Sequence, residues 1–296
     1  MRDGLLRIDA HTHIAPHSHT SNNRVNHVPT EFHVERMDKN GIDIAVVIAH
    51  GRAGWKMDDY RREHDLVAEE IAKFPDRLVG VCWADPLLGD DAVEEFERCV
   101  KDLGYLALKL HPVYQRFPFD GDIVNPLVDH AKALKLPVIA HLEPRVNGAE
   151  PWRMVRLAER YPEVTFVMAH MGRNVHSIEN GSIARLAARV PNIVLEASST
   201  FTDAYGTFQQ TAEILSPERI MLGTDSGPFH HPAINILKVE LLDLPREWAK
   251  FILSENAQRI FGLDPSRFGR APEYERGEFE TPHGRTKFPC PAPYMQ

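Results

Sequence analysis

Short apolar runs, each closed by a polar residue that can bind a metal or a proton, recur along the 296-residue chain. The six clearest runs are 8–13, 106–109, 137–141, 166–170, 193–196 and 220–225. A strand that is buried on both faces reads as a continuous apolar run. In parallel barrels the chemistry lies at the carboxyl ends of the strands. The pattern therefore predicts parallel strands whose ends share one site.

Strand and helix patterns alternate along the chain. The expected strands are 5–9, 42–49, 78–84, 105–110, 137–141, 164–169, 193–196 and 219–223. The expected helices are 30–40, 58–74, 90–103, 123–134, 151–160, 178–189, 204–215 and 246–261. Eight such units close into a barrel, whereas a doubly wound sheet usually needs fewer. The glycine fingerprint of a dinucleotide site is absent from the sequence. We therefore predict an α/β barrel spanning residues 1–263.

Two segments stand outside this barrel count. Residues 14–29 form a loop rich in His, Ser and Asn, which is a candidate lid. Residues 264–296 form a tail with little periodicity. The tail carries the aromatic residues Phe268, Tyr274, Phe279, Phe288 and Tyr294. Because such groups are unfavourable in water, we expect the tail to pack on the barrel or on a partner subunit.

The composition narrows the class of partner. A formal net charge of -8 argues against binding to nucleic acid or to anionic membranes. Three widely spaced cysteines without a CxxC motif fit a reducing compartment. No run is long enough to span a bilayer, and the start lacks the apolar core of a signal peptide. We expect a cytoplasmic protein that acts on a small molecule, and leave open whether it forms a homo-oligomer.

Five of the polar strand-end residues suggest a metal site. His11 and His13 lie two positions apart and so point to the same face of a strand. Taken alone, His141 or His170 reads as a core histidine and Asp225 as a helix cap. In a barrel, however, all these strand ends converge on one mouth. Three histidines and a carboxylate suit zinc, and they are acceptable to manganese or iron(II).

At these motifs the sequence resembles the amidohydrolase superfamily, and within it the amidohydrolase-2 branch that includes aminocarboxymuconate semialdehyde decarboxylase. The resemblance covers roughly residues 6–262. It rests on the motifs DAHTH (9–13), LKLHP (108–112), AHMG (169–172), GTD (223–225), SENA (254–257) and IFG (260–262). The resemblance implies a distorted (β/α)8 TIM barrel that holds one divalent metal ion. This branch contains lactone and amide hydrolases as well as non-oxidative decarboxylases.

By matching motifs, the resemblance implies particular roles at the site. The metal ligands would be His11, His13, His141 and Asp225, and His170 would be a catalytic or supporting residue. Zinc is the first expectation for the ion, with manganese or iron(II) as alternatives.

Lys109 admits two interpretations. In two-metal members of the superfamily, a carbamylated lysine on the fourth strand bridges both ions. No second cluster of ligands accompanies Lys109 in this sequence. We therefore expect Lys109 to act as a cation for the substrate or as the partner of a nearby carboxylate.

Other residues at the strand ends suit substrate recognition. Arg145 and Arg173 follow the fifth and sixth strands, and a guanidinium suits a substrate carboxylate. Either arginine could instead pair with a structural carboxylate. His111 is expected to contact the substrate, and His50 and Glu196 to support the ligands.

These residues predict a metal-dependent hydrolase of a small carboxylated lactone, amide or ester. A metal-bound water would attack the substrate, and Asp225 would take its proton and pass it to the leaving group. His170 would hydrogen-bond the water or the developing oxyanion. A barrel that binds metal without catalysis is a further alternative, against which the intact ligand set speaks.

The main alternative is a non-oxidative decarboxylase that uses the same one-metal site. Decarboxylation favours a dry, aromatic pocket, because excluding water strengthens the electrostatic interactions there. The strand ends are polar, and the tryptophans nearest to them are Trp55, Trp83 and Trp152. The polar mouth favours hydrolysis over decarboxylation.

Overall fold

The computed structural model describes residues 6–14, 29–172, 180–199, 207–227, 230–240, 244–272, 279–281 and 284–286. Within this part, eight parallel strands lie side by side in chain order. They are β1 (Ile8–Thr12), β2 (Ile44–Ile48), β3 (Leu78–Trp83), β4 (Leu108–Leu110), β5 (Val138–His141), β6 (Phe166–Ala169), β7 (Ile193–Glu196) and β8 (Ile220–Met221). The Ala10 amide donates to the Leu222 carbonyl at 2.9 Å and so joins the last strand to the first. The predicted barrel is confirmed.

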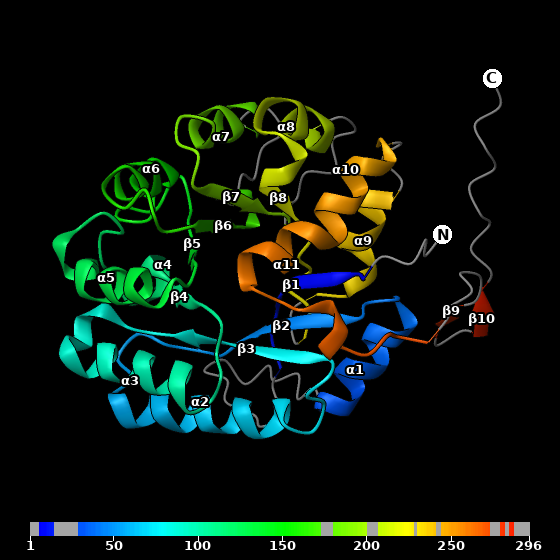
Figure 1. Cartoon of the computed structure of the whole chain (residues 1–296), viewed down its shortest axis with the longest axis horizontal. Helices are drawn as coiled ribbons and strands as arrows, with labels where there is room; N and C mark the ends of the chain where they lie inside the picture. Colours follow the sequence, from blue (N-terminus) through cyan, green and yellow to red (C-terminus); the bar gives the residue numbers. More distant parts are fainter. Residues whose placement is uncertain are drawn as a thin grey trace.

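Helices follow the strands and cover the outside of the barrel (Figure 1). They are α1 (Thr30–Lys39), α2 (Met57–Ile71), α3 (Asp90–Lys101), α4 (Pro112–Gln115), α5 (Asn125–Leu134), α6 (Pro151–Arg160), α7 (Asn180–Ala187), α8 (Thr207–Leu215), α9 (Pro232–Glu240), α10 (Arg246–Lys250) and α11 (Asn256–Phe261). Pro151 opens α6, where its missing N–H costs nothing. Gly262 ends α11 with a left-handed φ of 63°.

Two helical regions differ from the sequence prediction. The pattern after β8 predicts one helix, but α9 (Pro232–Glu240) precedes it. In α9 the polarity of the sequence does not follow burial, because Asn235 is buried while Ile234 is exposed, so the pattern that reveals a surface helix is weak. The expected helix 246–261 is interrupted by a π-helical turn at Phe251–Glu255, between α10 and α11. Among the described helices, none combines the length and the apolar composition needed to cross a bilayer.

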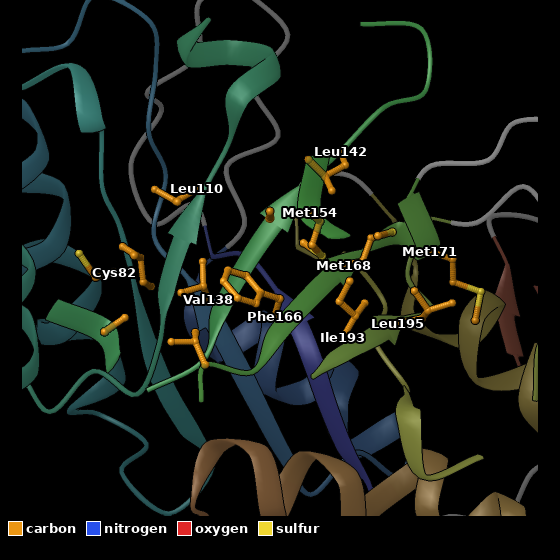
Figure 2. Close-up of a cluster of buried hydrophobic side chains, with 14 of the residues drawn as sticks. Cys82, Leu110, Val138, Leu142, Met154, Phe166, Met168, Met171, Ile193 and Leu195 are labelled. Carbon is orange, nitrogen blue, oxygen red and sulfur yellow. The ribbon is translucent and has the colours of Figure 1, made fainter. Parts of the chain in front are cut away.

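Side chains of successive strand residues alternate between two apolar layers. On β2, Ile44, Val46 and Ile48 belong to the layer that fills the barrel. Ala45 and Val47 belong to the layer between the strands and the helices. Figure 2 shows part of this outer layer: Leu110, Val138, Phe166, Met168, Ile193 and Leu195, with Met154 of α6. The period of two explains why buried strands read as continuous apolar runs.

The alternation of side chains between the two layers is interrupted by a bulge near the end of β1. Asp9 pairs with Ala45 of β2, but Thr12 pairs with Val47, so β1 has one extra residue between the two pairs. Such a bulge changes the direction of the side chains that follow it. It allows apolar residues at the start of β1 and histidines at its end to face the same interior.

The tail and the candidate lid are described only in part. The Gly269 amide donates to the Asp76 carbonyl at 3.0 Å, and the Ala271 amide donates to Asp43 Oδ1 at 2.8 Å. Strands β9 (Phe279–Thr281) and β10 (Gly284–Thr286) form an antiparallel pair. Residues 273–278, 282–283 and 287–296 of the tail, and 15–28 of the loop, lie outside the described residues. The division at residue 263, the lid and the packing of the whole tail stay predictions.

Candidate functional site

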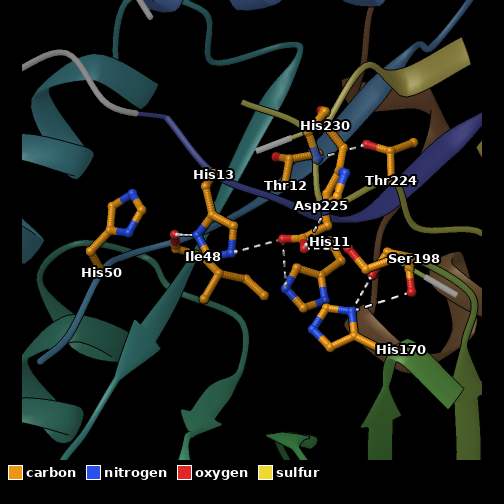
Figure 3. A network of polar contacts seen from close by, with 12 residues as sticks. His11, Thr12, His13, Ile48, His50, His170, Ser198, Thr224, Asp225 and His230 are labelled. Carbon is orange, nitrogen blue, oxygen red and sulfur yellow. Dashed lines mark hydrogen bonds and ion pairs between the residues drawn. The ribbon is translucent and has the colours of Figure 1, made fainter. Parts of the chain in front are cut away.

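Two histidines and an aspartate meet where β1 and β8 end (Figure 3). His13 Nε2 lies 3.4 Å from Asp225 Oδ1, and His11 Nε2 lies 3.9 Å from the same oxygen. Both histidines are buried, and the Asp225 side chain is only 14% exposed. The three donor atoms lie within 4.8 Å of one another. Two imidazole nitrogens and a carboxylate oxygen form a donor set suited to a divalent metal ion.

The backbone around Asp225 is held in an uncommon conformation. Asp225 has a φ of 53°, and its amide donates to the His11 carbonyl at 2.7 Å. A Cβ atom on Gly227 would lie 1.9 Å from the His13 carbonyl oxygen, so this close approach requires glycine. Strained backbone of this kind is often retained at functional sites. Here it brings the aspartate against both histidines.

Hydrogen bonds at Nδ1 fix the orientation of the His11 and His13 rings. His13 Nδ1 lies 2.9 Å from the Ile48 carbonyl oxygen, and His11 Nδ1 lies 2.8 Å from Glu196 Oε2. Each contact suits an N–H at Nδ1 and leaves Nε2 directed at Asp225. Metal-binding histidines commonly use carbonyl or carboxylate partners in this way. The donor set is therefore oriented as a metal site requires.

Glu196 is the centre of a buried network beside these ligands. The Ser198 hydroxyl donates to Glu196 Oε2 at 2.7 Å, and the Ser198 amide donates to Oε1 at 2.5 Å. His170 joins the network through its amide, which lies 3.3 Å from Glu196 Oε2, and through Nδ1, which lies 2.9 Å from Ser198 Oγ. A Cβ on Gly223 would lie 1.9 Å from Glu196 Oε1. The carboxylate is thus fixed from several sides.

Burial sets the charges of the site. It lowers the pKa of His11 and His13 well below the usual value, so both imidazoles are neutral at pH 7. It raises the pKa of Glu196 to about 7 and also raises that of Asp225. The pKa of Lys109 is lowered by burial, although the nearby carboxylates oppose this shift. Neutral imidazoles are the form that binds a metal.

The structure places His141 beside this group rather than within it. His141 Nε2 lies 3.1 Å from Glu143 Oε1. The His141 ring lies 4.7 Å, between centroids, from that of His170, which in turn lies 4.8 Å from that of His11. Its predicted role as a ligand stays a prediction.

An aromatic stack lines the same end of the barrel. The His111 ring stacks on Trp83, with centroids 5.0 Å apart, and on Tyr114 and His141, each at 4.1 Å. Lys109 is buried, and its Nζ lies 6.0 Å from the centre of the Trp83 ring. Aromatic rings therefore lie beside the polar residues at the strand ends. The order of residues in the sequence does not indicate this stacking.

The two candidate arginines are not part of the described site. Arg145 lies exposed on the loop after β5. Arg173 lies outside the described residues. Their roles in binding a substrate stay predictions.

Sequence reasoning missed two residues that contact Asp225. The Ser199 hydroxyl donates to Asp225 Oδ2 at 2.5 Å, and His230 Nε2 lies 3.6 Å from that oxygen. The available signal was their position in the segments that follow the β7 and β8 motifs, since Ser199 comes soon after Glu196 and His230 soon after Asp225. His50, which was expected to support the ligands, stacks on His13 with ring centroids 4.9 Å apart.

A parallel barrel with oriented, buried histidines and a largely buried aspartate at its mouth is typical of metal-dependent barrel enzymes. A family model described as Amidohydrolase matches residues 8–263. The chain belongs to this amidohydrolase family, as its motifs predict.

The chain is similar to curated decarboxylases over part of its length. It is 29% identical over 136 residues to gamma-resorcylate decarboxylase from Rhizobium sp. (strain MTP-10005), covering 39% of this chain and 41% of that protein. It is 31% identical over 112 residues to gamma-resorcylate decarboxylase from Rhodococcus jostii, covering 32% and 34%. The matches thus span about two fifths or less of these curated relatives.

Solved structures share the fold. A 2,6-dihydroxybenzoate decarboxylase from Rhizobium has a TM-score of 0.69 at 19% identity, covering 87% of this chain and 99% of that one. A 5-carboxyvanillate decarboxylase from Novosphingobium aromaticivorans, complexed with manganese, has a TM-score of 0.71 at 15% identity, covering 88% and 97%. At these identities the likeness concerns the fold alone.

The predicted hydrolysis of a lactone, amide or ester is wrong. The curated relatives are named as decarboxylases, and so are the two solved structures described above. The same metal donors serve hydrolysis and decarboxylation, so the choice between the two reactions depended on how polar the barrel mouth is. That polarity was overestimated, since Trp83, His111 and Tyr114 stack there.

Proposed function

We propose that the chain catalyses the non-oxidative decarboxylation of a small aromatic carboxylic acid with one divalent metal ion. The observation that carries this proposal is the buried, oriented group of His11, His13 and Asp225 in a family whose similar members are named as decarboxylases. The chemical class of the substrate follows from the same relatives, and from the aromatic faces beside the donor group.

The residues present fit a metal ion such as manganese. His11, His13 and Asp225 would hold it, with His141 proposed as a further donor. Mixed imidazole and carboxylate donors are acceptable to manganese, which the fold relative from Novosphingobium aromaticivorans contains. When bound, the ion supplies a Lewis acid that draws negative charge from substrate oxygens.

The chain itself provides a cation and an aromatic face for the substrate. Lys109 is buried near the Trp83 ring, and its ammonium group would attract a substrate carboxylate. The ring stack of Trp83 and His111 would exclude water from one side of the substrate. A dry environment favours loss of the charged carboxylate as neutral carbon dioxide.

Asp225 would transfer the proton of the reaction. When the carbon–carbon bond breaks, its electron pair stays on the ring carbon, which then takes a proton. The Asp225 carboxyl group would carry that proton on Oδ2, the oxygen that Ser199 and His230 contact. His230, whose side chain is 36% exposed, lies 3.6 Å from Asp225 Oδ2 and would return a proton from solvent. His170 would hold Glu196 in place through Ser198.

The proposal predicts carbon dioxide release that depends on metal and on Asp225. Manganese-loaded protein would be incubated with 2,6-dihydroxybenzoate, 5-carboxyvanillate and a panel of hydroxybenzoic acids, and carbon dioxide would be trapped. Asp225→Asn should slow release by about 10²- to 10⁴-fold, as expected on removing a proton-transfer group. Asp102→Asn, at an exposed position, is the matched control. Full activity of Asp225→Asn, or no release from any of these acids, would contradict the proposal.

A further inference from the structure

A second group of metal-binding side chains lies in the outer layer of the barrel wall. His64 comes from α2, Cys82 from β3 and Cys99 from α3. All three are fully buried, and their donor atoms lie within 4.8 Å of one another. Because side chains alternate along β3, Cys82 faces the helices while Trp83 faces the barrel interior. The group is therefore separate from the donors at the barrel mouth.

The spacing of this group fits a metal bonded to sulfur and nitrogen. Cys82 Sγ lies 3.7 Å from His64 Nε2. A zinc ion bonded to sulfur at about 2.3 Å and to nitrogen at about 2.0 Å, at a tetrahedral angle, separates the two donors by roughly 3.5 Å. The observed separation needs little adjustment to accept such an ion.

The surroundings of His64 supply the support that a ligating histidine needs. His64 Nδ1 lies 2.7 Å from Glu95 Oε1, which leaves Nε2 directed at the sulfur atoms. Glu95 is held by Arg98, whose guanidinium donates to both carboxylate oxygens at 2.8 Å. A carboxylate on the second ring nitrogen is the usual partner of a metal-binding histidine. The Tyr105 hydroxyl donates to the His64 carbonyl at 2.7 Å and fixes this turn of α2.

The charges of the group also balance. Two thiolates neutralise a divalent ion. Arg98 and Arg61 both contact Glu95, with Arg61 Nε 3.4 Å from Glu95 Oε2. Asp65 Oδ1, 2.8 Å from Arg98 Nη1, balances the second arginine. Burying an ion is costly unless its charge is compensated locally, as it is here. Thiolate donors select zinc over the harder ions that suit the barrel mouth.

We propose that His64, Cys82 and Cys99 form a second, structural metal site that takes zinc. Because the donors have no exposed surface, the ion would enter during folding rather than diffuse into the finished barrel. Once bound, it would tie α2 and α3 to β3. An ion that binds only the folded chain stabilises it.

The test uses the cysteine sulfur atoms as the reporter, because the donors described at the barrel mouth, His11, His13 and Asp225, bind through nitrogen and oxygen. The full chain would be refolded with Co²⁺ or Zn²⁺ under reducing conditions. Co²⁺ bound to cysteine thiolates gives an intense near-ultraviolet charge-transfer band. We expect this band in the wild type and in His11→Ala, and its loss in Cys82→Ala and Cys99→Ala. Cys290→Ala, the third cysteine of the chain, is the control and should keep the band.

X-ray absorption of the wild type makes the outcome independent of how well each variant folds, and zinc analysis adds a stoichiometry. Zinc-refolded wild type should hold one equivalent more than Cys99→Ala, and its zinc should show sulfur neighbours at about 2.3 Å. Absence of a thiolate band and of sulfur neighbours in wild type with free thiols would overturn the proposal. A Cys82–Cys99 disulfide that persists under reducing conditions would also overturn it. Neither result bears on carbon dioxide release, so the proposed function is tested separately.

Discussion

Two buried histidine–glutamate pairs in this protein have almost the same geometry, but the pKa values of their histidines are shifted in opposite directions. His11 Nδ1 lies 2.8 Å from Glu196 in the barrel mouth, and His64 Nδ1 lies 2.7 Å from Glu95 in the barrel wall. Burial lowers the pKa of His11 well below its usual value. Burial also opposes charge on His64, but its hydrogen bonds to Cys99 and Glu95 outweigh that effect and raise its pKa to about 9.

The difference arises from the residues around each carboxylate. Burial raises the pKa of Glu196 to about 7, and nearby Lys109 and His141 oppose a charge on His11. Burial also opposes charge on Glu95, but hydrogen bonds from His64 and Arg98 hold its pKa at about 2. An ionised carboxylate beside arginine thus favours an imidazolium, whereas a desolvated one beside lysine leaves the imidazole neutral. An ion bound in the wall would take the place of the His64 proton.

The largest expected effect comes from removing the charge of Glu95. Glu95→Gln leaves His64 and Arg98 without their ionic partner inside the wall, and should lower the free energy of unfolding by about 3 kcal/mol. Urea denaturation would measure the change. Glu97→Gln, whose carboxylate is partly exposed on the same helix, should cost less than about 1 kcal/mol. Equal losses of unfolding free energy in both variants would show that Glu95 stabilises the protein no more than a partly exposed carboxylate does.

A third buried histidine shows what happens without a carboxylate partner. Neither ring nitrogen of His33 has a hydrogen bond among the described residues, and burial, with Arg36 nearby, lowers its pKa from 6.5 to about 4. Between these values the unfolded chain binds a proton that the folded chain does not, so stability falls as pH falls from 6.5 to 4. The shift corresponds to at most about 3 kcal/mol.

Comparing wild type with His33→Leu isolates this contribution. The wild type should lose about 3 kcal/mol more stability than the variant between pH 7 and pH 4, measured by urea denaturation at each pH. The mouth histidines titrate in both proteins and cancel in the difference. Parallel stability curves for the two proteins would contradict the expected effect.

A smaller change is expected from Glu196→Gln. Loss of this carboxylate weakens the hold on His11, so affinity for manganese should fall about 10- to 100-fold, which is about 1.4 to 2.7 kcal/mol. Calorimetric titration with Mn²⁺ would measure it. Glu213→Gln, at an exposed position on α8, should bind manganese like wild type. Unchanged affinity in Glu196→Gln would mean that the pair in the mouth does not support metal binding.

The barrel and its mouth were predictable because both depend on strand periodicity. Apolar runs that end in polar residues marked the strand ends, and His11, His13, His170, Glu196 and Asp225 do meet there. The turn of His141 towards Glu143 depends on side-chain rotation, which periodicity does not encode.

Other features were hidden because their members are far apart in sequence or share no pattern. His64, Cys82 and Cys99 come from three elements, and the sequence offers no ligand spacing that links them. The stack of Trp83, His111 and Tyr114 joins β3 to the segment after β4, so the polarity of the mouth was misjudged. Helix α9 was missed because its polar and apolar residues do not match its exposed and buried positions, as buried Asn235 and exposed Ile234 show.

The proposed decarboxylation requires a single catalytic ion held by His11, His13 and Asp225. The direct test adds Mn²⁺ in steps to metal-free protein and follows carbon dioxide release from the best hydroxybenzoic acid substrate. We predict a linear rise that stops at about one equivalent of manganese per chain, and no rise in His11→Ala. Release that is complete without metal, or that is unaffected by His11→Ala, would contradict the account.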